Sequence, residues 1–367
     1  MNIGINGLGL IGGSIAKAIK QVHAQNSYII GYDTNKSDLQ AAYEDGVIDT
    51  IAPSLQTGFS TCNVVFICTP VHYIVDLVEA LLPYLPNDCI LTDVGSTKHE
   101  LIKEVSKHTA ASPKRIYYVG GHPMTGSERF GYVASSSHLF ENAYYMLTPQ
   151  ADTPEFILFI LQKLIERMGA IPLILSSSYH DFVAAHISHL PHIIASSLVH
   201  LVRNNDGEKA YLHALASGGF KDLTRIASSN PNIWTSICLS NKHQIKKAFN
   251  DYKGILEHFI DILENESEDE LYSFFDTSRI YRNTFPEGVV SSELTKRFSL
   301  HVDAKDEPGI IANIATLLSE HHINIKNLSV MSDREFDVGV IKIFFANKAD
   351  LIKATEVLSR HRYTIYY

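Results

Sequence analysis

Three glycines directly after the first apolar run constrain the fold of this chain more than any other feature. Gly7, Gly9 and Gly12 follow a strand-like run at residues 3–6 and lead into a helical pattern. Glycines at this spacing let backbone amides and a helix N-terminus approach a pyrophosphate. Asp33 ends the second strand-like run, 21 residues after Gly12, where a carboxylate can accept both ribose hydroxyls and repel a 2′-phosphate. The pattern predicts a dinucleotide site that takes NAD rather than NADP.

The first 175 residues have the periodicity of an α/β domain with a doubly wound sheet. Short runs rich in Val and Ile alternate with helical patterns, which is typical of a parallel sheet with crossover helices. A helix should have Thr153 as its N-cap and Pro154 at its first position, and should end near Gly169. The expected strands are residues 3–6, 28–32, 64–68, 90–93, 116–119, 144–148 and 172–175.

Two further domains are expected, at residues 176–290 and 296–367. The first carries almost no strand signal and should be all-helical, with a capping box from Ser267 to Glu270 that begins its last helix and a linker at 283–292. One helical stripe in it consists of Ile245, Phe249, Tyr252, Leu256, Phe259 and Leu263. The second should have the ferredoxin-like order βαββαβ, with elements at 298–302, 310–320, 323–331, 338–345, 351–359 and 363–367.

Composition limits the partners of the chain. Its formal net charge is -9, and it has no long run of Lys or Arg, which argues against a nucleic-acid or anionic-membrane partner. The apolar stretch at 156–161 is too short to span a bilayer. Cys62, Cys68, Cys89 and Cys238 lack metal-ligand spacing and are interpreted as reduced thiols of a cytoplasmic protein. A small-molecule ligand is therefore expected.

Polar residues follow three of the expected strands, at 69–71, 93–98 and 121–128. The carboxyl ends of parallel strands share one crevice, so these residues should meet near the nicotinamide. Neutral His122 can accept a hydroxyl proton as a hydride leaves the same carbon, and Ser96 can hold the imidazole or the hydroxyl. A hydrogen-bonded structural histidine is the alternative for His122, and a turn serine is the alternative for Ser96. The expected cofactor residues are Gly7, Gly9, Leu10, Ile11, Gly12, Asp33, Thr69 and Pro70.

The helical domain contributes two further candidates. Pro191 lies within a helical pattern beside His189 and His192, so a kink is expected there. His186, His189 and His192 have no Cys or carboxylate at matching spacing, and a metal site is not expected. Arg225 stands among apolar residues and needs an anionic partner, which is either Asp222 in a structural salt bridge or a ligand carboxylate.

Five motifs, taken in order, resemble the prephenate dehydrogenase family. They are GLGLIGGS at 7–14, DVGSTK at 93–98, HPMTGSE at 122–128, SHLPH at 188–192 and FKDLTRIA at 220–227, so the resemblance covers residues 1 to about 290. It implies a Rossmann domain followed by a helical dimerisation domain, and hence a homodimer. The implied reaction is the oxidation of prephenate by NAD, with release of carbon dioxide, to give 4-hydroxyphenylpyruvate.

The same resemblance suggests roles for individual residues. His122 would accept the hydrogen bond of the ring hydroxyl, supported by Ser96, and Arg225 would bind a carboxylate. Pairing a guanidinium with the departing carboxylate would resist decarboxylation, so Arg225 is expected to anchor the pyruvyl carboxylate, with the ring carboxylate as the alternative. The other expected substrate residues are Ser127, Glu128, His189, His192 and Trp234.

The C-terminal domain resembles an ACT domain, a regulatory module of amino-acid metabolism. Tyrosine or phenylalanine is the expected effector, bound at Asp306, Glu307, Pro308 and Gly309 in the first strand-to-helix turn. A dimerisation module without a ligand is the alternative for this domain. For the whole chain the alternatives are an arogenate dehydrogenase, in which Asp222 receives an ammonium group, and a catalytically silent sensor of NAD and an aromatic amino acid.

Overall fold

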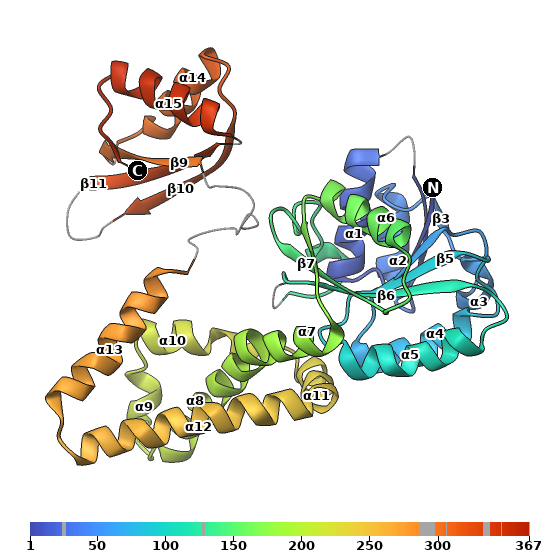
Figure 1. Ribbon diagram of the computed structural model, residues 1–367, viewed down its shortest axis with the longest axis horizontal. Helices are drawn as coiled ribbons and strands as arrows, with labels where there is room; N and C mark the ends of the chain where they lie inside the picture. Colours follow the sequence, from blue (N-terminus) through green and yellow to red (C-terminus); the bar gives the residue numbers. More distant parts are fainter. Residues whose placement is uncertain are drawn as a thin grey trace. The chain divides into compact units, whose positions relative to one another are not determined.

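The computed structural model describes residues 1–23, 27–126, 129–285, 298–305, 307–332, 338–345 and 347–366. The chain forms two compact units, Met1–Val290 and Ser291–Tyr367. The first contains the sheet domain and the helical domain, and the second contains a smaller sheet with two helices (Figure 1). The three expected types of domain are therefore present in the expected order.

An eight-stranded sheet forms the frame of the first unit, with the strand order β3-β2-β1-β4-β5-β6-β7-β8. Strands β1 to β6 are parallel, whereas β7 runs antiparallel to β6 and parallel to β8. The expectation of a parallel sheet is thus wrong at β7, because the described residues between β6 and β7 form only the short 3-10 turn η1 (Tyr132–Ala134) and no crossover helix. The strands are β1 (Asn2–Asn6), β2 (Tyr28–Tyr32), β3 (Thr50–Ile51), β4 (Val64–Ile67), β5 (Cys89–Asp93), β6 (Ile116–Pro123), β7 (Tyr144–Pro149) and β8 (Ile171–Ile174).

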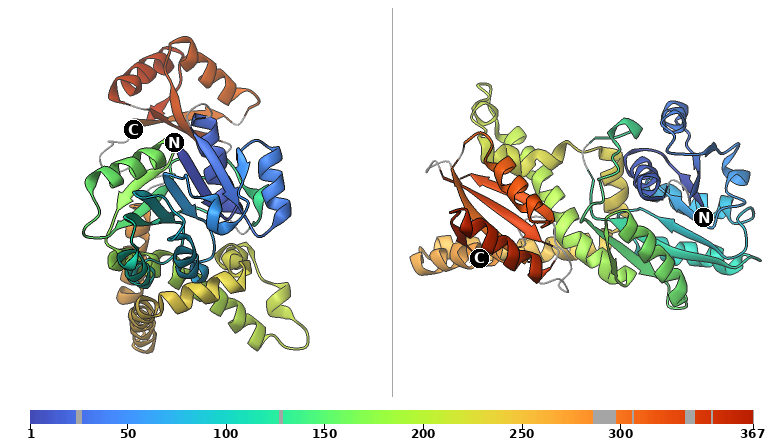
Figure 2. Two further views of the ribbon diagram at one scale, coloured as in Figure 1. Left: turned by 90° about the vertical axis from the view of Figure 1, so that its right-hand side faces the viewer. Right: turned by 90° about the horizontal axis from the view of Figure 1, so that it is seen from above.

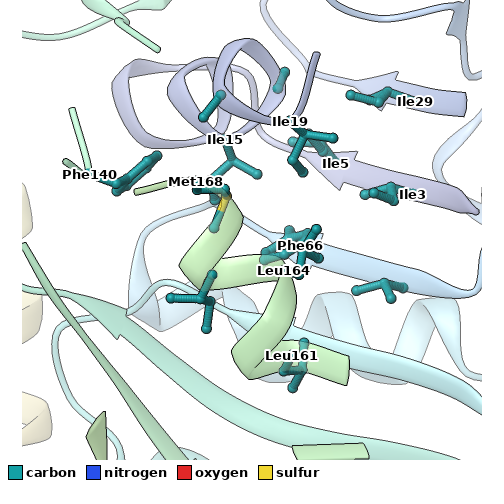
Figure 3. Packing of buried hydrophobic residues seen from close by; sticks show 14 of the residues in the cluster. Ile3, Ile5, Ile15, Ile19, Ile29, Phe66, Phe140, Leu161, Leu164 and Met168 are labelled. Atoms are coloured by element: carbon teal, nitrogen blue, oxygen red, sulfur yellow. The ribbon is translucent and has the colours of Figure 1, made fainter. Parts of the chain in front are cut away.

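Helices cover both faces of this sheet (Figures 1 and 2). Alternate strand residues such as Ile3 and Phe66 pack with α1 and α6, and the opposite face packs on α4 and α5. Figure 3 shows Leu164 of α6 beside Phe66 of β4, in the larger of these two layers. The helices are α1 (Leu10–His23), α2 (Lys36–Glu44), α3 (Leu55–Gly58), α4 (Val71–Leu81), α5 (His99–Ala111) and α6 (Glu155–Arg167).

The bounds of α6 correct one expectation about its start. Pro154, rather than Thr153, is the N-cap residue, and it makes no side-chain capping hydrogen bond. The helix therefore begins at Glu155. Its carboxylate lies in the first turn, where the helix dipole stabilises a negative charge. Gly169 follows the helix with a positive φ of 84°, so the predicted glycine stop is confirmed.

The rest of the first unit is helical, as expected. Ser267 caps its last helix, where its Oγ accepts the Glu270 amide at 3.4 Å. Along α12 the predicted stripe is only partly covered within the chain, because Phe249, Leu256 and Leu263 remain 41–50% exposed. The elements are α7 (Ser177–Ala184), the π-helical turn η2 (Ala185–His189), α8 (Leu190–Asn205), α9 (Tyr211–Ala214), α10 (Gly218–Thr224), the 3-10 turn η3 (Arg225–Ser228), α11 (Pro231–Ser240), α12 (Lys242–Glu264) and α13 (Glu268–Asn283).

The second unit has the predicted βαββαβ order. Its four strands are antiparallel, in the order β10-β11-β9-β12, and both helices pack on one face of the sheet (Figure 1). Most of the predicted linker lies outside the described residues, as does Asp306. The elements are β9 (Phe298–Lys305), α14 (Ile310–Glu320), β10 (Ile325–Ser332), β11 (Val338–Phe345), α15 (Lys348–Arg360) and β12 (Ile365–Tyr366).

Candidate active site

His122 lies within β6 rather than after it, which corrects the predicted strand end. The parallel pairing of β6 with β5 extends to Val119, and the antiparallel pairing with β7 continues through Pro123, with His122 opposite Met146. Glycine is required just before it, because a Cβ on Gly121 would clash with the main-chain oxygen of Asp93. Pairing with β7 and the close approach of Gly121 to Asp93 therefore fix the backbone that carries the imidazole of His122.

A hydrogen-bonded chain of side chains fixes the orientation of His122. Its Nδ1 lies 2.9 Å from Nε2 of His180 on α7, and Nδ1 of His180 lies 2.8 Å from Oδ1 of Asp181. A carboxylate only accepts, so His180 donates through Nδ1 and its Nε2 is the acceptor. His122 must then donate through Nδ1, and its Nε2 keeps a free lone pair. This is the tautomer that a general base for a hydroxyl requires.

Asp181 is itself held by the start of α5. Its Oδ1 accepts the amide of Lys98 at 2.7 Å, and its Oδ2 accepts the amide of His99 at 2.9 Å. These are the unpaired amides of a helix N-terminus, where a negative charge is favoured by the helix dipole. The N-cap side chain of α5 makes no capping hydrogen bond. Asp181 of the helical domain caps this helix instead.

The imidazoles of the site are kept neutral. Burial lowers the pKa of His122 well below its usual value, and the neighbouring His180 and the Lys98 cation lower it further. Burial also lowers the pKa of His180, although Asp181 opposes that effect. For His189, burial lowers the pKa to about 4. Neutral His122 can therefore accept a hydrogen bond at physiological pH.

A buried ion pair supports the loop between β5 and α5. Lys98 and Asp93 pair with fully buried side chains, and Asp93 also accepts the Tyr118 hydroxyl at 2.5 Å and the Gly95 amide at 2.7 Å. This network ties the start of α5 to β5 and β6. Ser96 is half-buried in the same loop, and its predicted role beside His122 stays a prediction.

The helical domain contributes a cluster of ring side chains and a cavity of its own. His192 of α8 stacks on Trp234 of α11, with ring centroids 3.4 Å apart, and His189 meets the same indole edge-on at 6.1 Å. His192 and Trp234 also line a cavity of about 510 Å³ together with Ala227 of the FKDLTRIA segment. Two of the predicted motifs, SHLPH and FKDLTRIA, therefore meet at this cavity.

A change of helical pitch lies just before Pro191, where the sequence predicts a kink. The main-chain amide of Leu190 bonds to the carbonyl of Ala185, an i to i−5 bond that defines the π-helical turn η2 just before Pro191. Such turns are frequent at functional sites. This one sets His189 in the buried interior, while Nδ1 of His186 bonds to the Phe182 carbonyl at 2.7 Å.

The dinucleotide crevice lies at the ends of β1, β2 and β4. Gly7 has a φ of 97°, which favours glycine, and a Cβ on Gly12 would clash with the Gly7 carbonyl. The carboxylate of Asp33 accepts the amide of Leu8 at 2.6 Å and the amide of Asn35 at 2.7 Å. A cavity of about 590 Å³ is lined here by Asn6, Gly7, Gly9, Tyr32, Asp33, Thr34, Leu55, Cys68, Thr69, Pro70, Tyr73, Asp76 and Leu77.

The remaining predicted residues lie in different places. Leu10 and Ile11 begin α1 beside the crevice, and Arg225 begins η3 with an exposed side chain. Ser127 and Glu128 lie outside the described residues. The segment from Glu307 to Gly309 precedes α14 in the second unit.

Sequence reasoning missed His180, Asp181 and Asn241, which the structure brings to the centre of the site. The adjacent His-Asp pair in a helical pattern was a weak signal, because nothing in the sequence connects it with His122, which is 58 residues away. Asn241 stands between two helices and gives no signal of its own. Among the described residues, no three His, Cys, Asp or Glu side chains are grouped so as to hold a metal ion.

Comparison with protein families matches the chain to three models along most of its length. The nucleotide-binding domain of prephenate dehydrogenase matches residues 15–173, and its dimerization domain matches residues 176–277. An ACT domain matches residues 298–362.

Individual relatives cover the same range. The prephenate dehydrogenase of Bacillus subtilis (strain 168) is 36% identical over 98% of this chain and 96% of its own length. Among solved structures, prephenate dehydrogenase from Aquifex aeolicus, in complex with hydroxyphenyl propionate and NAD+, has a TM-score of 0.72 at 31% identity and covers 77% of this chain and 97% of its own. Synechocystis arogenate dehydrogenase has a TM-score of 0.69 at 30% identity and covers 78% of this chain and 100% of its own. The chain belongs to the prephenate dehydrogenase family and carries a C-terminal ACT domain.

Proposed function

We propose that this chain converts prephenate to 4-hydroxyphenylpyruvate by NAD-dependent oxidative decarboxylation, with His122 at the ring hydroxyl. The observation that carries the proposal is the chain of hydrogen bonds from His122 through His180 to Asp181. It leaves a neutral Nε2 acceptor on β6, in the same sheet whose strands β1, β2 and β4 end at the dinucleotide crevice. As a member of its family, the chain is an NAD-dependent oxidoreductase.

Bound NAD supplies the hydride acceptor for this reaction. Hydride leaves C4 of the ring while the carboxylate at C1 departs as carbon dioxide, and the electrons of the broken carbon–carbon bond complete the aromatic ring. Positive charge develops on the C4 hydroxyl oxygen as the hydride leaves. His122 stabilises that charge as a general base, by drawing the hydroxyl proton toward its Nε2 in the transition state, and the proton returns to the phenol of the product.

The residues of the crevice fit the cofactor. Around Gly9 a Cβ would meet nothing within 4 Å, so the space above the start of α1 is open to a pyrophosphate. Asp33 would hold the ribose hydroxyls, with its carboxylate already fixed by two backbone amides. Thr69 and Pro70 would lie against the nicotinamide end, and Gly7, Leu10, Ile11 and Gly12 would form the phosphate turn.

Most substrate contacts are assigned to the helical domain. His189, His192 and Trp234 would border the ring and its side chain, and Arg225 would anchor the pyruvyl carboxylate. We also assign Ser127 and Glu128 to substrate binding, and Ser96 to support of the ring hydroxyl. In this assignment the departing carboxylate faces no cation, which favours loss of its charge as carbon dioxide.

The direct test is formation of NADH from NAD with prephenate and, separately, with arogenate. We expect catalytic efficiency with prephenate to be at least about tenfold higher. Arogenate is assayed separately because one similar solved structure is an arogenate dehydrogenase. Preference for arogenate would reverse the substrate assignment, and binding of NAD without turnover of either substrate would favour the sensor alternative.

We further propose that the chain is a homodimer formed through its helical domain. Large apolar side chains on α12 are exposed in the single chain, including Ile255, Ile260 and Leu263.

By length and composition alone, Ser177–Asn205 could cross a bilayer, and a third of its most apolar window is buried. Since it carries buried His180 and Asp181 of the site, we assign its apolar surface to protein contacts in a cytoplasmic enzyme. Sedimentation analysis tests this, with Leu263→Asp expected to give monomers.

The ACT domain is assigned to regulation by an aromatic amino acid. We place the effector, tyrosine or phenylalanine, at Glu307, Pro308 and Gly309 before α14, together with Asp306, which lies outside the described residues. Gly309 has a φ of 96° and is the N-cap residue of α14, and it provides no side-chain capping hydrogen bond, so the start of this helix suits a carboxylate. Calorimetric titration with each amino acid tests the assignment.

A further inference from the structure

His189 carries a polar atom that the described residues leave unsatisfied. Its side chain is 1% exposed, and its Nε2 is buried without a hydrogen-bond partner among the described residues. Its other ring nitrogen, Nδ1, lies 3.2 Å from Nδ2 of Asn241, which is itself only 3% exposed. An orphan buried nitrogen that is linked through Asn241, Asp181 and His180 to the proposed catalytic base indicates a ligand contact.

The bond from Asn241 defines the tautomer of His189. Nδ2 of Asn241 also donates to the main-chain oxygen of Asp181 at 2.8 Å, and a carbonyl can only accept, so the orientation of the amide is fixed. Nδ1 of His189 must then be the acceptor of the second Asn241 hydrogen. A neutral imidazole that accepts at Nδ1 carries its proton at Nε2. The orphan atom is therefore an N–H donor.

The two histidines of the site thus have opposite tautomers. Asp181 connects them: its carboxylate orients His180 and through it His122, and its main-chain oxygen orients Asn241 and through it His189. His122 offers an acceptor and His189 offers a donor. The ring hydroxyl of prephenate suits the first, and an oxygen acceptor of the substrate suits the second.

The chemistry of the substrate selects which oxygen that is. Carboxylates are paired most strongly by cations, and Arg225 has that role in the proposed function. The keto oxygen of the pyruvyl group is a neutral acceptor, which matches a neutral N–H. Arogenate carries an ammonium group at this carbon, and an ammonium group only donates, so it would face the His189 donor without a partner.

We propose that Asn241 is a positioning residue that holds His189 as a donor to the keto oxygen of the substrate, so that the site selects a 2-keto acid over the corresponding 2-amino acid. This inference rests on the proposed function. Neither residue needs to take part in hydride transfer. Selection would act through the unpaired donor that the wrong substrate leaves in the buried site.

The test reverses the tautomer. In Asn241→Asp a carboxylate would accept from Nδ1 of His189, and Nε2 would become an acceptor for an ammonium group. We expect the efficiency ratio of arogenate to prephenate to rise by about 10²-fold, mainly through a higher KM for prephenate. Because both efficiencies are measured with the same variant, a general loss of activity lowers both and leaves their ratio unchanged. Asn265→Asp is the matched control, since it adds the same charge at the exposed C-cap of α12, at the other end of that helix from Asn241, and should leave the ratio unchanged.

A second measurement reports the tautomer without activity. Nitrogen NMR of histidine-labelled protein separates protonated from unprotonated ring nitrogens, and His189→Gln identifies the His189 signals. We expect protonated Nε2 in the wild type and protonated Nδ1 in Asn241→Asp. If Asn241→Asp does not fold, Asn241→Leu and His189→Gln, which lose the fixed donor, should each raise the ratio at least about fivefold.

The outcomes separate this inference from the proposed function. Absence of prephenate oxidation by the wild type would remove the proposed function, whereas the tautomer measurement would still stand. A wild-type His189 protonated at Nδ1 would overturn the inference. The inference would also be overturned by an unchanged efficiency ratio of arogenate to prephenate in a variant whose His189 tautomer has switched. The same holds if the ratio is unchanged in both Asn241→Leu and His189→Gln.

Discussion

Nδ1 of His122 lies 2.9 Å from Nε2 of His180, and this hydrogen bond joins the sheet domain to the helical domain. The proposed base belongs to β6, and the group that fixes its tautomer belongs to α7. A second bond, from Thr97 Oγ1 to Ser240 Oγ at 2.9 Å, joins the same two domains beside it. The correct form of the base therefore depends on how the two domains pack, as well as on the local structure of β6.

Replacement of the proposed base should affect turnover more than binding. We expect His122→Asn to lower kcat by about 10²-fold or more with little change in KM for prephenate, because the hydrogen bond to the hydroxyl strengthens only as charge develops. Arg225→Ala should instead raise KM most. Steady-state kinetics of both variants, with melting temperatures as the stability control, measure this. Loss of stability alone in both variants would make the two residues structural.

His180 should act through His122. His180→Ala removes the acceptor for Nδ1 and frees the tautomer, so we expect kcat to fall by about tenfold or more at unchanged KM. His180→Gln can present its side-chain oxygen to Nδ1 and should recover part of that loss. Equal activity of the two variants would show that the bond to His180 does not orient the base.

The parts of this site that follow from sequence are those set by short-range patterns. The glycine turn, Asp33 and the strand ends depend on local spacing, and the structure places Gly7, Gly9, Asp33, Thr69 and Pro70 around one cavity. His180 was not found because its value depends on a contact between segments that are far apart in the chain. The extension of β6 through Pro123 was missed for a similar reason, since it requires pairing with β7.

Cofactor choice should follow from Asp33. Its carboxylate is held by the amides of Leu8 and Asn35 and cannot move away from a 2′-phosphate without breaking those bonds. We expect the wild type to use NAD at least about 10²-fold more efficiently than NADP. Asp33→Asn keeps the shape and should reduce this preference. The assignment of Asp33 fails if the wild type has comparable kcat/KM with both cofactors.

Buried neutral histidines should make stability fall in mild acid. Burial lowers the pKa of His189 to about 4, below an ordinary value of about 6.5, so below about pH 6.5 the unfolded chain binds a proton that the folded chain does not. The contribution is fully present above that pH and is lost as the pH falls toward 4. From pH 7.5 to pH 5, His189→Gln should therefore lose about 2 kcal/mol less unfolding free energy than the wild type. Urea unfolding at both pH values measures the difference, and equal losses would contradict the buried neutral state.

The proposed control by the ACT domain can be tested separately from competition at the catalytic site. The first unit is compact by itself, and the Aquifex aeolicus structure covers only 77% of this chain. Truncation after Ser292 should therefore leave an active enzyme. We expect tyrosine or phenylalanine to inhibit the full-length chain by favouring a less active state, and the truncated chain to lose most of that inhibition. Activity of both forms is measured over a range of each amino acid, with prephenate held near its KM. Equal inhibition of the two forms would instead place the amino acid in the catalytic pocket near His192, because a product-like ring competes there without any second domain.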